Sequence, residues 1–150
     1  MYWKDFFTPI EWWKLIPDND GIIVSGQSGD PEWIKTAARS SDGDLILVYY
    51  PERDQAEINM AKITSGDEVS AKWWNPANKS ESEIGTYPAT GTQAFTPPTG
   101  WEDALLVLES NENTIAGIVT DTLNNPLQDA TITDGTRIDT TDVIGAYIIE

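Results

Sequence analysis

Short apolar runs separated by turn residues dominate this sequence and restrict it to a β-rich fold. The run Leu45–Tyr50 is apolar at both alternating positions and follows Asp42-Gly43, a pair typical of tight hairpin turns. Since both of its faces are apolar, we expect this strand to lie covered at the centre of a sheet. Ala104–Leu108 has the same character, whereas Ala56–Met60 and Val69–Trp74 alternate as half-exposed strands do. Strands at roughly ten-residue spacing with such turns predict an antiparallel β-sandwich.

Two segments depart from the strand pattern. Residues 2–8 form the one helix candidate, which Pro9 ends. The segment Asp18–Gly21 begins like a calcium loop but lacks the alternating spacing and the distal glutamate, so we expect a turn held by Asx hydrogen bonds. Three aspartates could approach a cation only if their turns converged: Asp134, Asp139 and Asp142. The preference of aspartate for hairpin turns accounts for their presence without a metal ion. We therefore predict no metal site and no cofactor.

A change of composition divides the chain in two. All seven tryptophans precede residue 109, and residues 111–150 hold one basic and seven acidic residues, a net charge of −6. We expect a sandwich at residues 1–110, a linker at 111–113 and a second β module at 114–150. Its expected strands are Ile115–Thr120, Ala130–Thr133, Arg137–Thr140 and Ala146–Ile149. Four strands this short cannot close a second sandwich or Ig-like module, so we predict that it is incomplete.

Composition also excludes several classes of function. The 150 residues contain no cysteine and no histidine, which excludes disulfides, zinc sites with these ligands, cysteine nucleophiles and Ser-His-Asp triads. The net charge of −16 argues against nucleic acid and anionic membranes as partners. No apolar run is long enough for membrane insertion, and the N-terminus has no signal-peptide pattern. No carboxylate pair stands out as an acid/base couple, so we expect no catalytic residues and no enzyme.

Residues 5–109 resemble a known family, the module described as a collagen-binding domain of a collagenase. This β-sandwich follows the barrel in apiosidase-like glycoside hydrolases. The segments that carry the resemblance, in order, are Phe6-Phe7, Trp12–Asp18, Ala37–Asp44, Val48–Pro51, Ala71–Pro76, Ile84-Gly85, Phe95–Pro98 and Leu105–Leu108. The resemblance implies an accessory sandwich beside a sugar-cleaving barrel, and the family description implies binding of matrix protein.

Residues 114–150 resemble the beginning of a carboxypeptidase-regulatory-like domain, a transthyretin-type sandwich. The segments that carry this second resemblance are Ile115–Asp121, Asn125–Thr131 and Thr141–Tyr147. Such repeats commonly continue for several further strands after the Gly-x-Tyr position, which here is Gly145-Ala146-Tyr147.

Three tryptophans are the candidate ligand-binding residues, because a sugar ring stacks on an exposed aromatic face. Alternation along Val69–Trp74 places Trp73 in the core and Trp74 on the opposite, exposed face. Trp101 and Trp33 follow turn residues and are expected in loops. The competing interpretation is that all three are core plugs, loop anchors or contacts to a barrel domain.

The second module suggests a different role, because an incomplete sheet leaves backbone N–H and C=O groups free to pair with another strand. The candidate residues for such intermolecular strand pairing are Ile115, Ile118, Val119, Tyr147, Ile148 and Ile149.

Two functions follow from these observations. The first is a non-catalytic, extracellular or cell-surface accessory module that binds or positions polysaccharide or matrix protein beside a glycoside hydrolase domain. The alternative is a structural subunit of an extracellular filament or oligomer, self-associated through its C-terminal segment.

Overall fold

The computed structural model describes residues 2–111, 115–135 and 137–149, and the chain divides into two compact units at residues 1–111 and 112–150. Unit 1 contains a six-stranded sheet in the order β1-β3-β4-β9-β6-β7, with all neighbouring strands antiparallel. Its strands are β1 (Leu15–Pro17), β3 (Thr36–Ser40), β4 (Leu45–Tyr50), β6 (Glu68–Trp74), β7 (Glu81–Pro88) and β9 (Ala104–Asn111).

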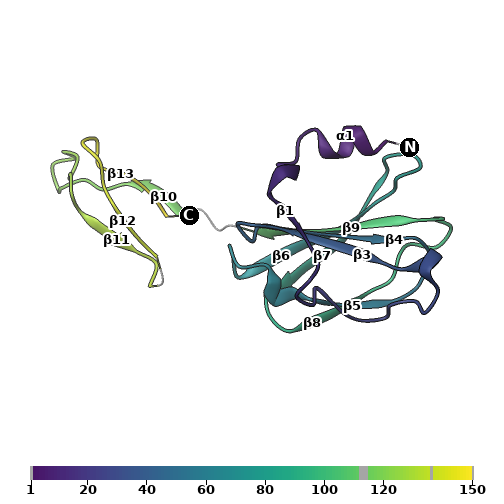
Figure 1. The fold of residues 1–150 in the computed structure, drawn as a ribbon. Coiled ribbons are helices and arrows are strands. Elements are labelled where there is room, and N and C mark those ends of the chain that lie inside the picture. Colours follow the sequence, from purple (N-terminus) through teal and green to yellow (C-terminus); the bar gives the residue numbers. More distant parts are fainter. Residues whose placement is uncertain (1, 112–114, 136, 150) are drawn as a thin grey trace. The chain divides into compact units, whose positions relative to one another are not determined.

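A smaller antiparallel sheet in the order β2-β5-β8 covers one face of the larger sheet. Its strands are β2 (Ile23–Ser25), β5 (Ala56–Asn59) and β8 (Thr92–Phe95). Figure 1 shows the larger sheet between this smaller sheet and the short helix α1 (Trp3–Phe7). The predicted all-β sandwich is confirmed, as are the helix after residue 2 and the central position of β4.

The described residues of unit 1 also include three single 3-10 turns. They are η1 (Trp12–Lys14), η2 (Pro31–Trp33) and η3 (Met60–Lys62). The expected strand Ala56–Met60 therefore ends one residue early, at Asn59, whose side chain accepts a hydrogen bond from the Ala61 N–H and caps η3. The expected linker at 111–113 begins on the last residue of β9, Asn111, and its other two residues lie outside the described residues.

Two turns form for the reasons that the sequence suggests. Between β3 and β4, Gly43 has a φ of 80° and approaches Thr64 so closely that a Cβ would lie 1.9 Å from its hydroxyl oxygen. The carboxylate of Asp18 accepts hydrogen bonds from the N–H groups of four residues, 20 to 23, which confirms the Asx turn. Partial burial opposes ionisation of Asp18, but the four donors together hold its pKa below the ordinary value.

The core between the two sheets contains a buried hydroxyl group that lacks a hydrogen-bond partner among the described residues. Tyr50 is fully buried, with its ring 5.1 Å from that of Trp73, and its hydroxyl finds no hydrogen-bond partner among the described residues. Burial raises the pKa of Tyr50. Its neighbour along β4, Tyr49, faces the other side of the sheet and donates a hydrogen bond to Asp103 at 3.0 Å.

Unit 2 has two separate two-stranded antiparallel sheets, β10-β13 and β11-β12. Their strands are β10 (Ile115–Ile118), β11 (Thr131–Thr133), β12 (Ile138–Thr140) and β13 (Ala146–Ile149). Among the described residues of this unit, Ile149 is the only buried hydrophobic side chain, while Ile118, Ile138 and Ile148 are more than half exposed. Unit 2 is therefore an open β module held mainly by hydrogen-bonded turns.

No helix among the described residues is long and apolar enough to cross a bilayer.

The two tyrosines of β4 give a matched stability test. Tyr50→Phe should raise the free energy of unfolding by about 1 kcal/mol, because it removes a buried hydroxyl that lacks a partner. Tyr49→Phe should lower it by about 1 kcal/mol, because it leaves a carboxylate without its phenol donor. Urea denaturation followed by circular dichroism measures both. Destabilisation by Tyr50→Phe would contradict the described packing.

Candidate functional site

The face of the six-stranded sheet that points away from the smaller sheet has an apolar centre and two different margins. Strand register aligns Trp74, Leu105 and Tyr49 in one row across this outer face. The next row aligns Lys72, Val107 and Leu47. Beyond the centre, β7 contributes Glu81 and Glu83 to this face, whereas β3 contributes the smaller Thr36 and Ala38. The outer face is thus charged on the β7 side, apolar in the middle and shallow over β3.

Helix α1 covers the apolar centre with aromatic rings. The ring of Phe6 lies 4.7 Å from that of Trp74, and the ring of Trp3 lies 5.4 Å from Trp74 and 5.7 Å from Tyr49. An ion pair between Lys79 and Asp5 fastens the helix to the turn that joins β6 and β7. None of the five helical residues is buried, so α1 is a thin cover.

The expected exposure of Trp74 is wrong. Alternation does place Trp73 and Trp74 on opposite faces of β6, and Trp73 lies in the main core as predicted. Trp74 is nevertheless only 4% exposed, because Phe6 and Trp3 pack over it. Its ring faces are therefore not free to stack on a ligand in solvent.

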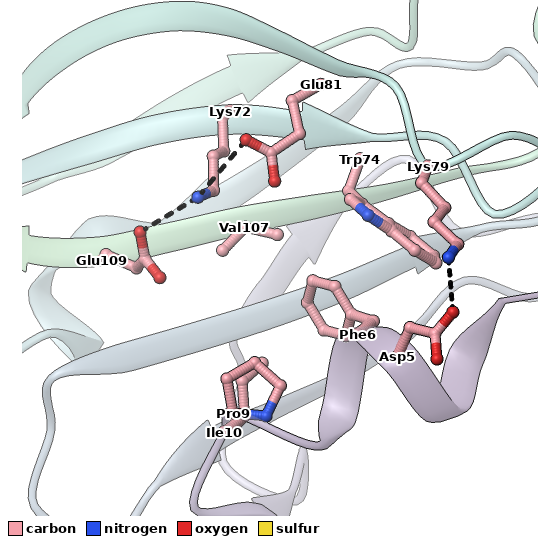
Figure 2. Close-up of a pocket in the computed structure, with 10 residues that line it drawn as sticks. All are labelled: Asp5, Phe6, Pro9, Ile10, Lys72, Trp74, Lys79, Glu81, Val107 and Glu109. Atoms are coloured by element: carbon pink, nitrogen blue, oxygen red, sulfur yellow. Dashed lines mark ion pairs between the residues drawn. The ribbon is translucent and has the colours of Figure 1, made fainter.

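A groove of about 320 Å³ lies at the charged margin, between α1 and strands β6, β7 and β9. Figure 2 shows Lys72, Glu81 and Glu109 along one side of the groove and Phe6 with Trp74 on the other. The ten lining residues are Asp5, Phe6, Pro9, Ile10, Lys72, Trp74, Lys79, Glu81, Val107 and Glu109. Such a mixture of apolar surface and a few convergent polar groups is typical of binding sites.

Two lysines neutralise part of the acidic rim of this groove. The Nζ of Lys72 lies 3.5 Å from Glu109 and 3.8 Å from Glu81, on the strands either side of β6. The Nζ of Lys79 contacts Asp5 and lies 4.5 Å from the centre of the Tyr2 ring. The groove therefore offers both hydrogen-bond donors and carboxylate acceptors around an apolar wall.

The other two predicted tryptophans do not join Trp74 in one platform. Trp101 is partly buried against the core between the sheets, whereas Trp33 is 41% exposed on η2. No ring contact links these three tryptophans in the described part of the chain.

Sequence reasoning also missed the most exposed aromatic pair, on η1. Trp12 is 60% and Trp13 is 64% exposed, with their ring centres 6.0 Å apart. The next residue, Lys14, bonds to Asp42 at 2.6 Å and to Glu11, which ties η1 to the β3–β4 turn. The Lys14 ammonium holds the pKa of Asp42 below its ordinary value. No local pattern distinguished this pair from ordinary core aromatics.

In unit 2, the strands expected to pair with another molecule pair with each other. Ile115 lies opposite Ile149 and Gly117 lies opposite Tyr147, so β10 and β13 form an intrachain ladder. Val119 also takes part, because its N–H donates to the Gly145 carbonyl. A partner strand would therefore have to use an outer edge of this sheet.

The two outer edges differ. On β13, the N–H groups of Ala146 and Ile148 donate to the carboxylates of Asp142 and Asp139 at 3.0 and 2.8 Å. The Ile148 N–H, followed by that of Thr140, holds the pKa of Asp139 below its ordinary value. On β10, alternation turns the backbone groups of residues 116 and 118 away from β13, and no described residue hydrogen-bonds to them there. Among the described residues, the open edge of this sheet is therefore that of β10.

About three quarters of this chain has a fold that is also found in larger proteins. A solved structure titled "Glycoside hydrolase" matches with a TM-score of 0.64 at 23% identity, covering 75% of this chain and 24% of that one. A glycoside hydrolase family 5 structure from Bacteroides vulgatus ATCC 8482 also has a TM-score of 0.64, at 20% identity, covering 73% and 23% of the two chains. This chain thus spans about a quarter of the length of each.

By its fold, the protein belongs to the class of all-β sandwiches, and the two longer chains contain a sandwich of this kind. Residues 16–109, more than half of the 150, match the family described as "Putative collagen-binding domain of a collagenase", and the chain belongs to that family. The resemblance expected from the sequence is confirmed for unit 1. A search of curated proteins gave no match.

Removal of one ring from α1 tests whether the helix covers the sheet. Phe6→Ala should lower the free energy of unfolding by about 2 kcal/mol and shift tryptophan emission to longer wavelength, because Trp74 becomes hydrated. Trp13→Ala is the matched control and should change stability by less than about 0.5 kcal/mol, because this ring is mostly exposed. Equal effects of the two substitutions, measured by urea denaturation, would show that α1 does not shield Trp74.

Proposed function

We propose that unit 1 is a non-catalytic accessory module that binds a carbohydrate chain in the groove beside α1. It would act at the cell surface or outside the cell and hold polysaccharide near a glycoside hydrolase domain. Membership of the collagen-binding-domain family and the fold shared with two glycoside hydrolases support a module of this kind.

The observation that carries the proposal is the composition of the groove. A sugar ring has apolar C–H faces and a periphery of hydroxyl groups, so it needs an apolar wall with nearby donors and acceptors. Phe6, Pro9 and Val107 provide apolar surface. Lys72 provides N–H donors, while Glu81 and Glu109 provide carboxylate acceptors.

The same geometry favours binding over hydrolysis. The side chains of Glu81 and Glu109 are each 49% exposed, and both form ion pairs with Lys72. A glycosidase needs one carboxyl group kept protonated in an apolar pocket so that it can act as the acid. Neither glutamate has such surroundings.

Affinity electrophoresis in gels containing xylan, arabinan, β-glucan or polygalacturonate tests this proposal. At least one polysaccharide should retard migration of the chain. The substitutions Glu109→Gln and Lys72→Gln, made together, should weaken that binding roughly tenfold or more, because hydrogen bonds to charged groups are lost. Glu57→Gln, on the exposed side of β5 in the other sheet, is the matched control and should bind normally.

The outcomes separate the alternatives. Solid-phase binding to collagen serves as a parallel arm, since the family description names that protein. Collagen binding without any polysaccharide binding would overturn the carbohydrate proposal, and so would polysaccharide binding that Glu109→Gln and Lys72→Gln leave intact.

The open edge of β10 favours a second function, self-association through strand pairing in unit 2. Ile118 and Ile148 lie on one face of the β10-β13 ladder and are 66% and 53% exposed, so an added strand would bury apolar surface as well as pair backbone groups. The net charge of −6 on residues 111–150 opposes contact between copies, so association should strengthen with salt.

Sedimentation velocity tests this second candidate. The chain should form oligomers at high protein concentration in 0.5 M salt, and Ile118→Pro should abolish them, because proline removes the outward N–H of β10. Thr131→Pro on β11 is the control that leaves the β10 edge intact. A chain that stays monomeric in high salt would exclude self-association.

A further inference from the structure

A second hollow, of about 350 Å³, lies on the other side of α1 and shares no lining residue with the groove. The side chains that define it are Trp3 and Phe7 on α1, Leu15 on β1, Leu47 and Tyr49 on β4, and Leu105 on β9. We call it the apolar hollow.

The apolar hollow exists because β3 carries small residues on its outer face. Register places Thr36 beside Tyr49 and Ala38 beside Leu47. The rings of α1 stand over β4, β6 and β9, where they contact Tyr49 and Trp74. Nothing of comparable size rises from β3, so a space lined by aromatic and aliphatic carbon remains above it.

The lining of the apolar hollow carries no charged residue; its side-chain hydroxyls are those of Thr36 and, on a ring, of Tyr49. The Tyr49 hydroxyl donates its hydrogen to Asp103 at 3.0 Å. Burial, followed by the hydrogen bond to Asp103, raises the pKa of Tyr49 to about 12, so the phenol stays protonated at neutral pH. Its oxygen is then left with a lone pair that can accept a hydrogen bond from a ligand.

From these features we propose that the apolar hollow binds a neutral aromatic ring system that bears one hydroxyl group, a phenol-type ligand. Its volume suits a molecule of one or two rings, and its carbon lining suits a flat apolar surface. The ligand hydroxyl would donate to Tyr49. With no cation in the lining and a net charge of −16 on the chain, an anionic analogue would be excluded. This proposal does not depend on carbohydrate binding in the groove.

Three probes with the same ring system test each part of the proposal by isothermal titration to the full chain. We expect saturable binding of 2-naphthol. Naphthalene should bind roughly fivefold more weakly, because it lacks the hydroxyl group. 2-Naphthoate should show no detectable binding. Equal binding of all three probes, or no saturable binding of 2-naphthol, would overturn the proposal.

Variants locate the binding. Ala38→Leu should fill the apolar hollow and weaken 2-naphthol binding at least tenfold, and Thr36→Leu provides a second filling variant if the first one misfolds. Tyr49→Phe should reduce 2-naphthol binding about fivefold and leave naphthalene unchanged. Ala94→Leu, at an exposed position of β8, is the control for added apolar bulk.

The groove variant Glu109→Gln should bind 2-naphthol as the natural sequence does, which keeps this test separate from that of carbohydrate binding. Unchanged 2-naphthol binding in both filling variants would place the probe elsewhere and overturn the assignment.

Discussion

The six-stranded sheet of unit 1 is apolar on both faces at its centre, and this constraint governs the rest of the module. The smaller sheet covers one face, but the other face, with Trp74, Leu105 and Leu47, also has to leave water. A helix of only five residues does this with Trp3, Phe6 and Phe7. Because the cover is narrow, it leaves one hollow beside the charged margin of the sheet and one beside the small residues of β3. Both proposed sites of unit 1 follow from this incomplete third layer.

Unit 2 is organised by a different interaction. Almost no apolar side chain of its described residues is buried, and aspartates hold the backbone in place. The Asp121 carboxylate accepts from the N–H groups of Leu123 and Asn125, while Asp142 and Asp139 occupy the outer edge of β13. The acidic composition of this segment is thus partly structural. By occupying one edge of the sheet, these carboxylates leave β10 as the edge that a further strand can use.

Four of the nine strands described in unit 1, namely β4, β5, β6 and β9, could be predicted because strand periodicity and turn chemistry are local properties. Leu45–Tyr50 is apolar at every position because it lies between β3 and β9 with both faces covered. The exposure of Trp74 could not be predicted, since alternation identifies its face but not the covering ring of Phe6, 68 residues earlier in the chain. The groove could not be predicted for the same reason, because Lys72, Glu81 and Glu109 come together only through the register of three strands.

Both proposed sites of unit 1 depend on the contact between α1 and the outer face of the sheet. Nuclear Overhauser spectroscopy of the chain in solution can measure it through cross-peaks between the ring protons of Phe6 and the indole protons of Trp74. We expect strong cross-peaks, together with protection of the Trp74 indole from a soluble paramagnetic probe, since the two ring centres are 4.7 Å apart. Absence of these cross-peaks, with a Trp74 indole as accessible to the probe as that of Trp13, would contradict it.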